Sequence, residues 1–157
     1  MLDVGSVAPS FTLFDQDNQA VSLEEFRDKQ NVVIYFYPKD NTPGCTLEAQ
    51  EFSNSIAEYR ALETTVLGIS RDSVGSHQKF CSLLGLKVRL LSDPEHQVIE
   101  AYGAWQLKKM MGKEFMGIVR STFLIDKEGI IRQVWPKVTP AGHALAVLEA
   151  IKKLNTP

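Results

Sequence analysis

The sequence is poor in cysteine: 157 residues contain only Cys45 and Cys81. Two cysteines do not make a disulfide framework, and a chain of this length buries enough apolar surface to fold without one. The longest apolar run, residues 32–37, is far too short to cross a bilayer, and the first residues show no basic segment followed by an apolar one. We therefore expect a cytoplasmic protein without membrane association, in a reducing compartment where cysteine is either inert packing or reactive.

The chain also lacks an excess of charge of either sign. Lysine and arginine total 17 against 19 aspartate and glutamate, which gives a net charge of −2. This balance provides no electrostatic reason to bind nucleic acid or an acidic membrane surface. Internal repeats, low-complexity segments and linkers are absent too, so the sequence predicts one domain over residues 1–157.

What the sequence does contain is an alternation of strand and helix patterns. Ser22, with Glu25 three residues later, is typical of a capping box that opens a short helix. The other predicted elements are hairpins 10–14 with 20–23 and 121–125 with 130–135, strands 32–37, 64–70 and 88–91, and helices 43–62, 74–84, 93–102 and 139–154.

This order predicts an α/β fold of the thioredoxin type. Strand–helix–strand repeats require parallel crossovers, and the two hairpins add antiparallel strands, so the central sheet should be mixed and flanked by helices, with a β-hairpin at the N-terminus. In open α/β sheets the chemistry lies at the carboxyl ends of strands. Cys45 lies just past the end of the strand 32–37 and stands at a predicted helix start, marked by Pro43.

A thiol at a helix N-terminus gains from the unpaired N–H groups and the partial positive charge there, since both favour the thiolate. Ionisation alone gives a modest gain in rate, because nucleophilicity falls as the thiolate is stabilised. A fast reaction needs further groups that stabilise charge on the leaving atom. The alternative is that Cys45 is a small buried hydrophobe, a frequent role of free cysteine.

Three other residues are candidates to assist Cys45. Thr42 places a hydroxyl in the same turn, Pro38 shapes and dries the loop, and Arg120 precedes a buried strand and offers a fork of donors. Each has a plain structural alternative: Thr42 as a turn or cap residue, and Arg120 as a solvated charge at a strand edge.

Pro38, Thr42 and Cys45 together fit the P-x-x-x-T-x-x-C signature, and here the chain resembles the peroxiredoxin family. The longer string FYPKDNTPGCTLEAQEF is similar to the bacterioferritin comigratory protein, or peroxiredoxin Q, branch. The resemblance runs nearly end to end, through VGSVAPSFTL, GISRDSVGSHQKF, LLSDPEHQVIEAYGAW and RSTFLIDKEGIIRQVW. A collinear set of this kind is highly specific.

The resemblance implies a thiol-dependent peroxidase that reduces hydrogen peroxide and organic hydroperoxides without cofactor or metal. By the same resemblance, Cys45 is the peroxidatic nucleophile and becomes a sulfenic acid. Thr42 and Arg120 hold the thiolate and polarise the peroxide. The N–H groups of Gly44 and Cys45 bind its oxygens. Pro38 would shield the site, and Glu48 would orient Arg120.

A second thiol normally resolves the sulfenic acid. Many relatives carry it five residues after the first, but Gln50 stands there in this chain. The resemblance implies that Cys81, on the following helix, forms a redox disulfide with Cys45, which a thioredoxin or glutaredoxin then reduces. Cys81 also lies on an apolar stripe beside Phe80, so core packing is the alternative. Because a loop-end thiol and a mid-helix thiol rarely meet disulfide geometry, we expect both helices to unwind partly.

Other functions fit the sequence less well. A dithiol reductase needs C-x-x-C, and Glu48 occupies the second position. A cysteine hydrolase needs a histidine, but His77, His96 and His143 all lie in predicted helices. His77 and Cys81 alone make a poor zinc site. A peroxide sensor would use the same Cys45 chemistry without turnover. We further expect a monomer, and a solvated loop over residues 107–117.

Overall fold

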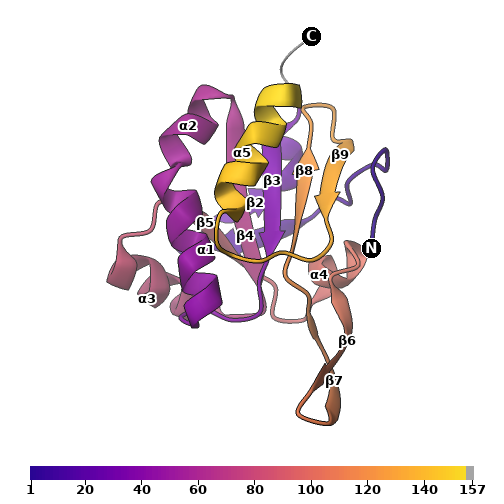
Figure 1. Ribbon diagram of the computed structural model, residues 1–157. Helices are drawn as coiled ribbons and strands as arrows, with labels where there is room; N and C mark the ends of the chain where they lie inside the picture. Colours follow the sequence, from indigo (N-terminus) through magenta and orange to yellow (C-terminus); the bar gives the residue numbers. More distant parts are fainter. Residues whose placement is uncertain (155–157) are drawn as a thin grey trace.

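The computed structural model describes residues 1–154, and its centre is a sheet of seven strands (Figure 1). The strands follow the order β2-β1-β5-β4-β3-β8-β9. Their bounds are β1 Thr12–Asp15, β2 Ala20–Ser22, β3 Asn31–Phe36, β4 Thr64–Ser70, β5 Arg89–Ser92, β8 Ser121–Ile125 and β9 Ile131–Trp135. Strands β3, β4 and β5 are parallel, and the remaining pairs are antiparallel. The thioredoxin-like α/β fold with a mixed sheet and an N-terminal hairpin is therefore confirmed.

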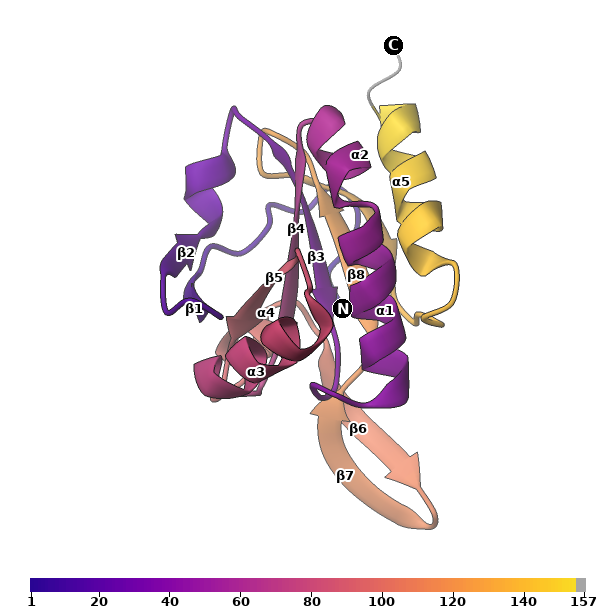
Figure 2. The same cartoon turned by 90° about the vertical axis from the view of Figure 1, so that its left-hand side faces the viewer.

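Helices cover both faces of this sheet. Three of them, α1 (Pro43–Asn54), α2 (Ile56–Ala61) and α5 (His143–Leu154), lie together on one face, as Figure 2 shows. The others are α3 (Val74–Leu84), α4 (Gln97–Ala101) and the 3-10 helix η1 (Leu23–Phe26). Every residue of β3 is buried, as expected for a central strand covered on both sides.

The pleat of β3 divides the core into two clusters. Val33 and Tyr35 face the cluster that holds α1, α2, α5 and the inner side of α3. Ile34 and Phe36 face the opposite cluster, with residues of β1, β2, η1 and α4. Cys45 and Cys81 both belong to the first cluster. The alternation of side chains along one strand thus puts both thiols on the same side of the sheet.

The helix predicted over residues 43–62 is two helices. The break lies at Ser55, whose backbone N–H donates to the carbonyl of Phe52 at 3.1 Å, a tighter turn than the α-helical one. The apolar stripe continues across the break, which is why the pattern reads as one helix. Leu47, which the pattern counts in that stripe, is 39% exposed instead.

The predicted starts of two other helices are wrong, and a third helix, η1, starts after Ser22 as predicted but without the expected side-chain cap. The hydroxyl of Ser22 lies 2.7 Å from that of Thr12 and caps no helix, so the expected capping box is absent and η1 is a 3-10 turn. Helix α4 begins at Gln97 rather than after Asp93, which accepts the backbone N–H of Ile99 at 2.9 Å. Helix α5 begins at His143 instead of position 139.

Helix α5 starts later than predicted because of the backbone conformation before it. Gly142 has φ of 78°, a left-handed value that interrupts any helix begun at Pro140. The buried face of α5 also differs from the predicted stripe at one position. Leu145, expected on the apolar stripe, is 61% exposed, whereas Ala144, Val147 and Leu148 are buried.

Residues 107–117, expected to be a loop, belong to a second sheet. Strands β6 (Trp105–Met110) and β7 (Lys113–Ile118) form a two-stranded antiparallel hairpin that projects away from the body (Figures 1 and 2). Its register pairs Leu107 with Met116 and Lys109 with Glu114. Over residues 1–154, no helix combines the length and the apolar character needed to pass through a membrane.

Candidate active site

Cys45 lies where the fold predicts chemistry, just beyond the carboxyl end of β3. It is the third residue of α1, whose first residue is Pro43 and whose N-cap is Thr42. The thiol is 1% exposed and belongs to a buried apolar cluster. N–H groups in the first helical turn have no acceptor inside the helix, so those of Gly44 and Cys45 are free to donate to a bound oxygen.

Arg120 reaches this thiol from the other side of the site. Its Nη2 donates to the Cys45 sulfur at 3.3 Å. The guanidinium comes from the residue before β8, and β8 starts opposite the end of β3, with Ser121 paired to Phe36. Two elements distant in sequence therefore place a fixed positive charge and a helix N-terminus at one sulfur, and both stabilise negative charge there.

Glu48 holds the other arm of the same guanidinium. Arg120 Nη1 donates to Glu48 Oε1 at 2.7 Å, and the Glu48 side chain is fully buried. Burial raises the pKa of Glu48 to about 7, even though the charge and hydrogen bond of Arg120 act to lower it. Its second oxygen, Oε2, is buried and has no hydrogen-bond partner among the described residues.

Gly44 leaves room for Arg120. A Cβ atom at this position would lie 3.1 Å from Arg120 Nη2 and 3.4 Å from Pro140 Cγ. Pro140 belongs to the segment before α5, and the N–H of Val138 in that segment donates to the carbonyl of Arg120 at 2.9 Å. Sequence patterns gave no sign that residues 138–140 border the site.

Thr42 and Pro38 stand at the edge of the site. The hydroxyl of Thr42 donates to the backbone carbonyl of Lys39 at 2.8 Å. Pro38 is exposed at the start of the same loop. Neither side chain makes a hydrogen bond to Cys45 among the described contacts, so their expected roles stay predictions.

Cys81 lies in the middle of α3, and both cysteines are free thiols. Its side chain is buried against the same cluster as Cys45. Burial, followed by the charges of Asp40, Asp17 and Asp15, raises the pKa of Cys81 to about 12. In this form of the protein Cys81 is therefore a protonated, sheltered thiol.

The histidines do not form a catalytic pair with Cys45. His77 is fully buried and lies 2.7 Å from the carboxylate of Asp40. His143 Nε2 lies 2.8 Å from the Thr122 hydroxyl, and burial, with a smaller effect from Arg120, lowers the pKa of His143 to about 4. His77 also lies near Asp72, but protein donors already occupy these carboxylates.

Comparison with known proteins agrees with this geometry. The AhpC/TSA family model matches residues 4–134. Peroxiredoxin Bcp of Bacillus subtilis (strain 168) is 42% identical over 154 residues, which cover 98% of each chain. The bacterioferritin comigratory protein of Xanthomonas campestris, solved in a study of its alkyl peroxide reduction activity, superposes with a TM-score of 0.91 at 38% identity and 99% coverage of both chains.

Two further solved structures are serine variants of peroxiredoxin Q from Xanthomonas campestris. One replaces the cysteine at its position 48 and the other that at position 84, with TM-scores of 0.91 and 0.90, identities of 38% and 39%, and coverage of 98% or more of each chain. Both family and fold therefore match over nearly the whole chain. The chain belongs to the AhpC/TSA family, and within it to the Bcp peroxiredoxins, so it is a thiol-dependent peroxidase.

Proposed function

We propose that Cys45 is the peroxidatic thiol of this enzyme. Its thiolate attacks the nearer oxygen of a hydroperoxide, the O–O bond breaks, and the departing oxygen takes a proton to leave as water or an alcohol. The sulfur keeps the other oxygen as a sulfenic acid. The observation that carries this proposal is the 3.3 Å contact from Arg120 to a sulfur in the first turn of α1.

The groups around Cys45 then have distinct roles. Arg120 stabilises the thiolate and the charge that develops on the leaving oxygen, while Glu48 fixes the direction of the guanidinium through its second arm. The N–H groups of Gly44 and Cys45 donate to the peroxide oxygens. Thr42 contributes its hydroxyl once it turns from the Lys39 carbonyl.

Pro38 completes the site by limiting the access of water to the loop in front of Cys45. The organic part of the substrate extends toward solvent, so both hydrogen peroxide and organic hydroperoxides are accepted. No metal or cofactor takes part in these steps. The enzyme acts as a single cytoplasmic domain and as a monomer, and it binds neither nucleic acid nor membrane.

Cys81 is the resolving thiol in this proposal. Its sulfur attacks the sulfur of the sulfenic acid, the S–O bond breaks, and the hydroxyl leaves as water with the thiol proton. A disulfide between Cys45 and Cys81 results. Support comes from the spacing: the cysteines replaced at positions 48 and 84 of the Xanthomonas campestris protein are 36 residues apart, as are Cys45 and Cys81.

Two consequences follow for the cycle. A disulfide requires Cα atoms within about 4.4–6.8 Å, so α1 and α3 open locally to bring together two thiols that are each packed within a helix. A dithiol reductant of the thioredoxin or glutaredoxin type then attacks the disulfide and returns both thiols.

Thiol counting tests this proposal. Free thiols are measured in unfolded protein before and after one equivalent of hydrogen peroxide, for wild type, Cys45→Ser and Cys81→Ser. Wild type should lose both thiols and show an intramolecular disulfide by mass spectrometry. Cys81→Ser should lose its single thiol to a sulfenic acid, and Cys45→Ser should lose none. Full thioredoxin-dependent turnover by Cys81→Ser would contradict the role of Cys81.

A further inference from the structure

A buried aspartate–histidine pair links the two segments that carry the cysteines. Asp40 Oδ2 lies 2.7 Å from His77 Nδ1, and the two side chains are 3% and 0% exposed. Asp40 belongs to the loop that leads from β3 into Cys45. His77 lies on α3, one helical turn before Cys81. Neither residue contacts the thiol or the guanidinium of the active site.

Both ring nitrogens of His77 have polar partners. Nδ1 lies 2.7 Å from the carboxylate of Asp40 and 3.4 Å from the Tyr37 hydroxyl, and Nε2 lies 3.0 Å from the carbonyl oxygen of Leu91. Because both nitrogens are engaged in the protein interior, the ring is held between the loop, α3 and β5.

Three further hydrogen bonds fix Asp40, two accepted by its carboxylate and one donated by its backbone. Its Oδ1 accepts the Tyr37 hydroxyl at 2.5 Å, and its Oδ2 accepts the Ser76 hydroxyl at 2.8 Å. Its backbone N–H donates to Asp72 at 2.8 Å. Burial tends to raise the pKa of Asp40, but the hydrogen bond and charge of His77 outweigh it, and the pKa lies below its ordinary value.

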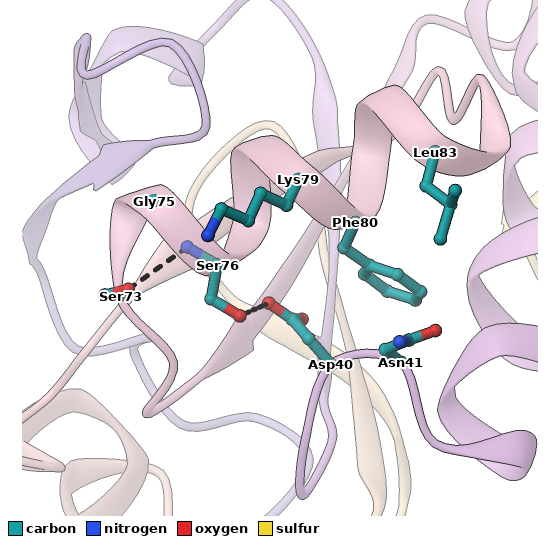
Figure 3. Close-up of a pocket in the computed structure, with 8 residues that line it drawn as sticks. All are labelled: Asp40, Asn41, Ser73, Gly75, Ser76, Lys79, Phe80 and Leu83. Carbon is teal, nitrogen blue, oxygen red and sulfur yellow. Dashed lines mark hydrogen bonds between the residues drawn. The ribbon is translucent and has the colours of Figure 1, made fainter.

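Beside these polar contacts, a pocket of about 430 Å³ opens between the loop and α3, lined by Asp40, Asn41, Ser76 and Phe80 among others. Figure 3 shows the Ser76–Asp40 bond crossing from the helix to the loop beside this opening. The Asp40–His77 contact and the Ser76–Asp40 bond are therefore direct polar links between the loop and the helix.

Opening of α3 must break this link. Cys81 is sheltered as long as the helix is closed, and the charge of Asp40 also disfavours its thiolate. When one partner of a buried pair withdraws, the other is left uncompensated in the interior, which is strongly unfavourable. The closed helix is therefore stabilised in proportion to the strength of this pair.

We propose that the Asp40–His77 pair is a latch that holds α3 closed over Cys81, and that it controls the rate of the resolving step without affecting the peroxide step. This inference rests on the proposed pairing of Cys45 with Cys81. In that step Cys81–SH and Cys45–SOH give the disulfide and one water. His77 is a positioning residue, since it acts on Cys81 through α3.

The test uses a variant that replaces both partners together, Asp40→Asn with His77→Gln, so that no unpaired carboxylate stays in the interior. One equivalent of hydrogen peroxide is added, and samples are quenched with an alkylating agent over time. Mass spectrometry then follows thiol, sulfenic acid and disulfide separately. We expect disulfide formation to accelerate roughly tenfold or more, with loss of the Cys45 thiol within about twofold of wild type.

Ile151→Val is the matched control, because it weakens the same apolar cluster from α5 without touching α3 or the Asp40–His77 pair. It should leave both rates unchanged. A second readout is hydrogen exchange over residues 74–84 of the reduced protein, where the double variant should lose protection. Tyr37→Phe and Ser76→Ala weaken the same carboxylate more mildly, and they should show smaller increases in the same rate if the double variant does not fold.

The outcomes separate the two proposals. If wild type forms no intramolecular disulfide, the proposed role of Cys81 fails. If wild type forms the disulfide, but the latch variants form it at the wild-type rate, the latch is wrong. An equal change in both rates, or unchanged exchange over α3, would also overturn it.

Discussion

Arg120 and Cys45 lie 75 residues apart in the chain, yet the guanidinium Nη2 is 3.3 Å from the sulfur. The sheet explains this proximity, because β3 ends and β8 begins at the same edge. It also makes the guanidinium the central group of the site, since its other arm is held by Glu48 at 2.7 Å.

Replacement of Arg120 by Gln should slow the reaction of Cys45 with hydrogen peroxide by about 10²–10³, the typical effect of removing one charge-stabilising donor from a site. Stopped-flow competition with a peroxidase of known rate gives the second-order rate constant. Arg132→Gln is the control, because Arg132 is an exposed arginine paired with Asp126. Wild-type reactivity of the Arg120 variant would show that the cation has no part in peroxide reduction.

Gly44→Ala should slow the same reaction by roughly tenfold, because the new methyl group meets Arg120 Nη2 at 3.1 Å and displaces the guanidinium. Gly75→Ala is a close control: it is also the second residue of a helix, but a Cβ there meets only the Ser73 hydroxyl oxygen, at 3.8 Å. Circular dichroism should show both variants folded. Equal peroxide rates for the two variants would count against a packing role of Gly44.

Because Glu48 titrates differently in the folded and unfolded states, the free energy of unfolding should fall as pH rises from 4.5 to about 7. Its folded pKa lies above the ordinary value of 4.5, so the folded state keeps a proton that the unfolded chain releases within this range. The loss is at most ~3 kcal/mol. Urea denaturation at several pH values measures the free energy of unfolding.

Glu48→Gln provides the comparison for this pH effect, since it retains an acceptor for Arg120 without the titrating group. The dependence of stability on pH over this range should become flatter in Glu48→Gln, while the exposed Glu128→Gln should follow wild type. A wild type whose stability increases through the same pH range would mean that the ion pair with Arg120 outweighs burial.

Cys81 should react slowly with disulfide reagents while the protein is folded. Burial, with the charges of Asp40, Asp17 and Asp15, raises its pKa to about 12, so at pH 8 its thiolate fraction is on the order of 10³ lower than that of an ordinary cysteine. In Cys45→Ser, where Cys81 is the remaining thiol, reaction with a disulfide reagent should be slower by at least this factor. Addition of urea should restore the ordinary rate, and a fast reaction without urea would mean that α3 is open.

Much of the fold could be predicted because the periodicity of the sequence matches the packing. Strand 64–70 and helix 74–84 were predicted with the bounds that the structure has, since one is a β-branched run and the other ends at Gly85, which has φ of 61°. The hairpin β6–β7 was missed because most of its apolar side chains, Leu107, Met110, Phe115 and Met116, stay exposed. Its sequence therefore lacks the alternation of apolar and polar residues that marks a half-buried strand.

Part of the site could be predicted from position along the chain, which indicated Cys45 and Arg120, and the family resemblance added Glu48. The structure brings these three together. The Asp40–His77 pair was missed, because its partners are 37 residues apart and no periodic pattern joins them. In the sequence His77 attracted notice only for its spacing from Cys81 on one helix face, and that spacing does not point to Asp40.

The antiparallel pairing of β3 with β8 has a consequence for how the enzyme tolerates change. A short loop after β3 leads to the thiol and the guanidinium directly precedes β8, so the backbone ladder between these two strands sets where the two groups meet. The hairpin β6–β7 projects from the body between them in the chain, so a change in its length leaves this ladder unaltered. A slip of one residue in that ladder, by contrast, would turn Arg120 to the opposite side of the sheet and leave the sulfur without its cation.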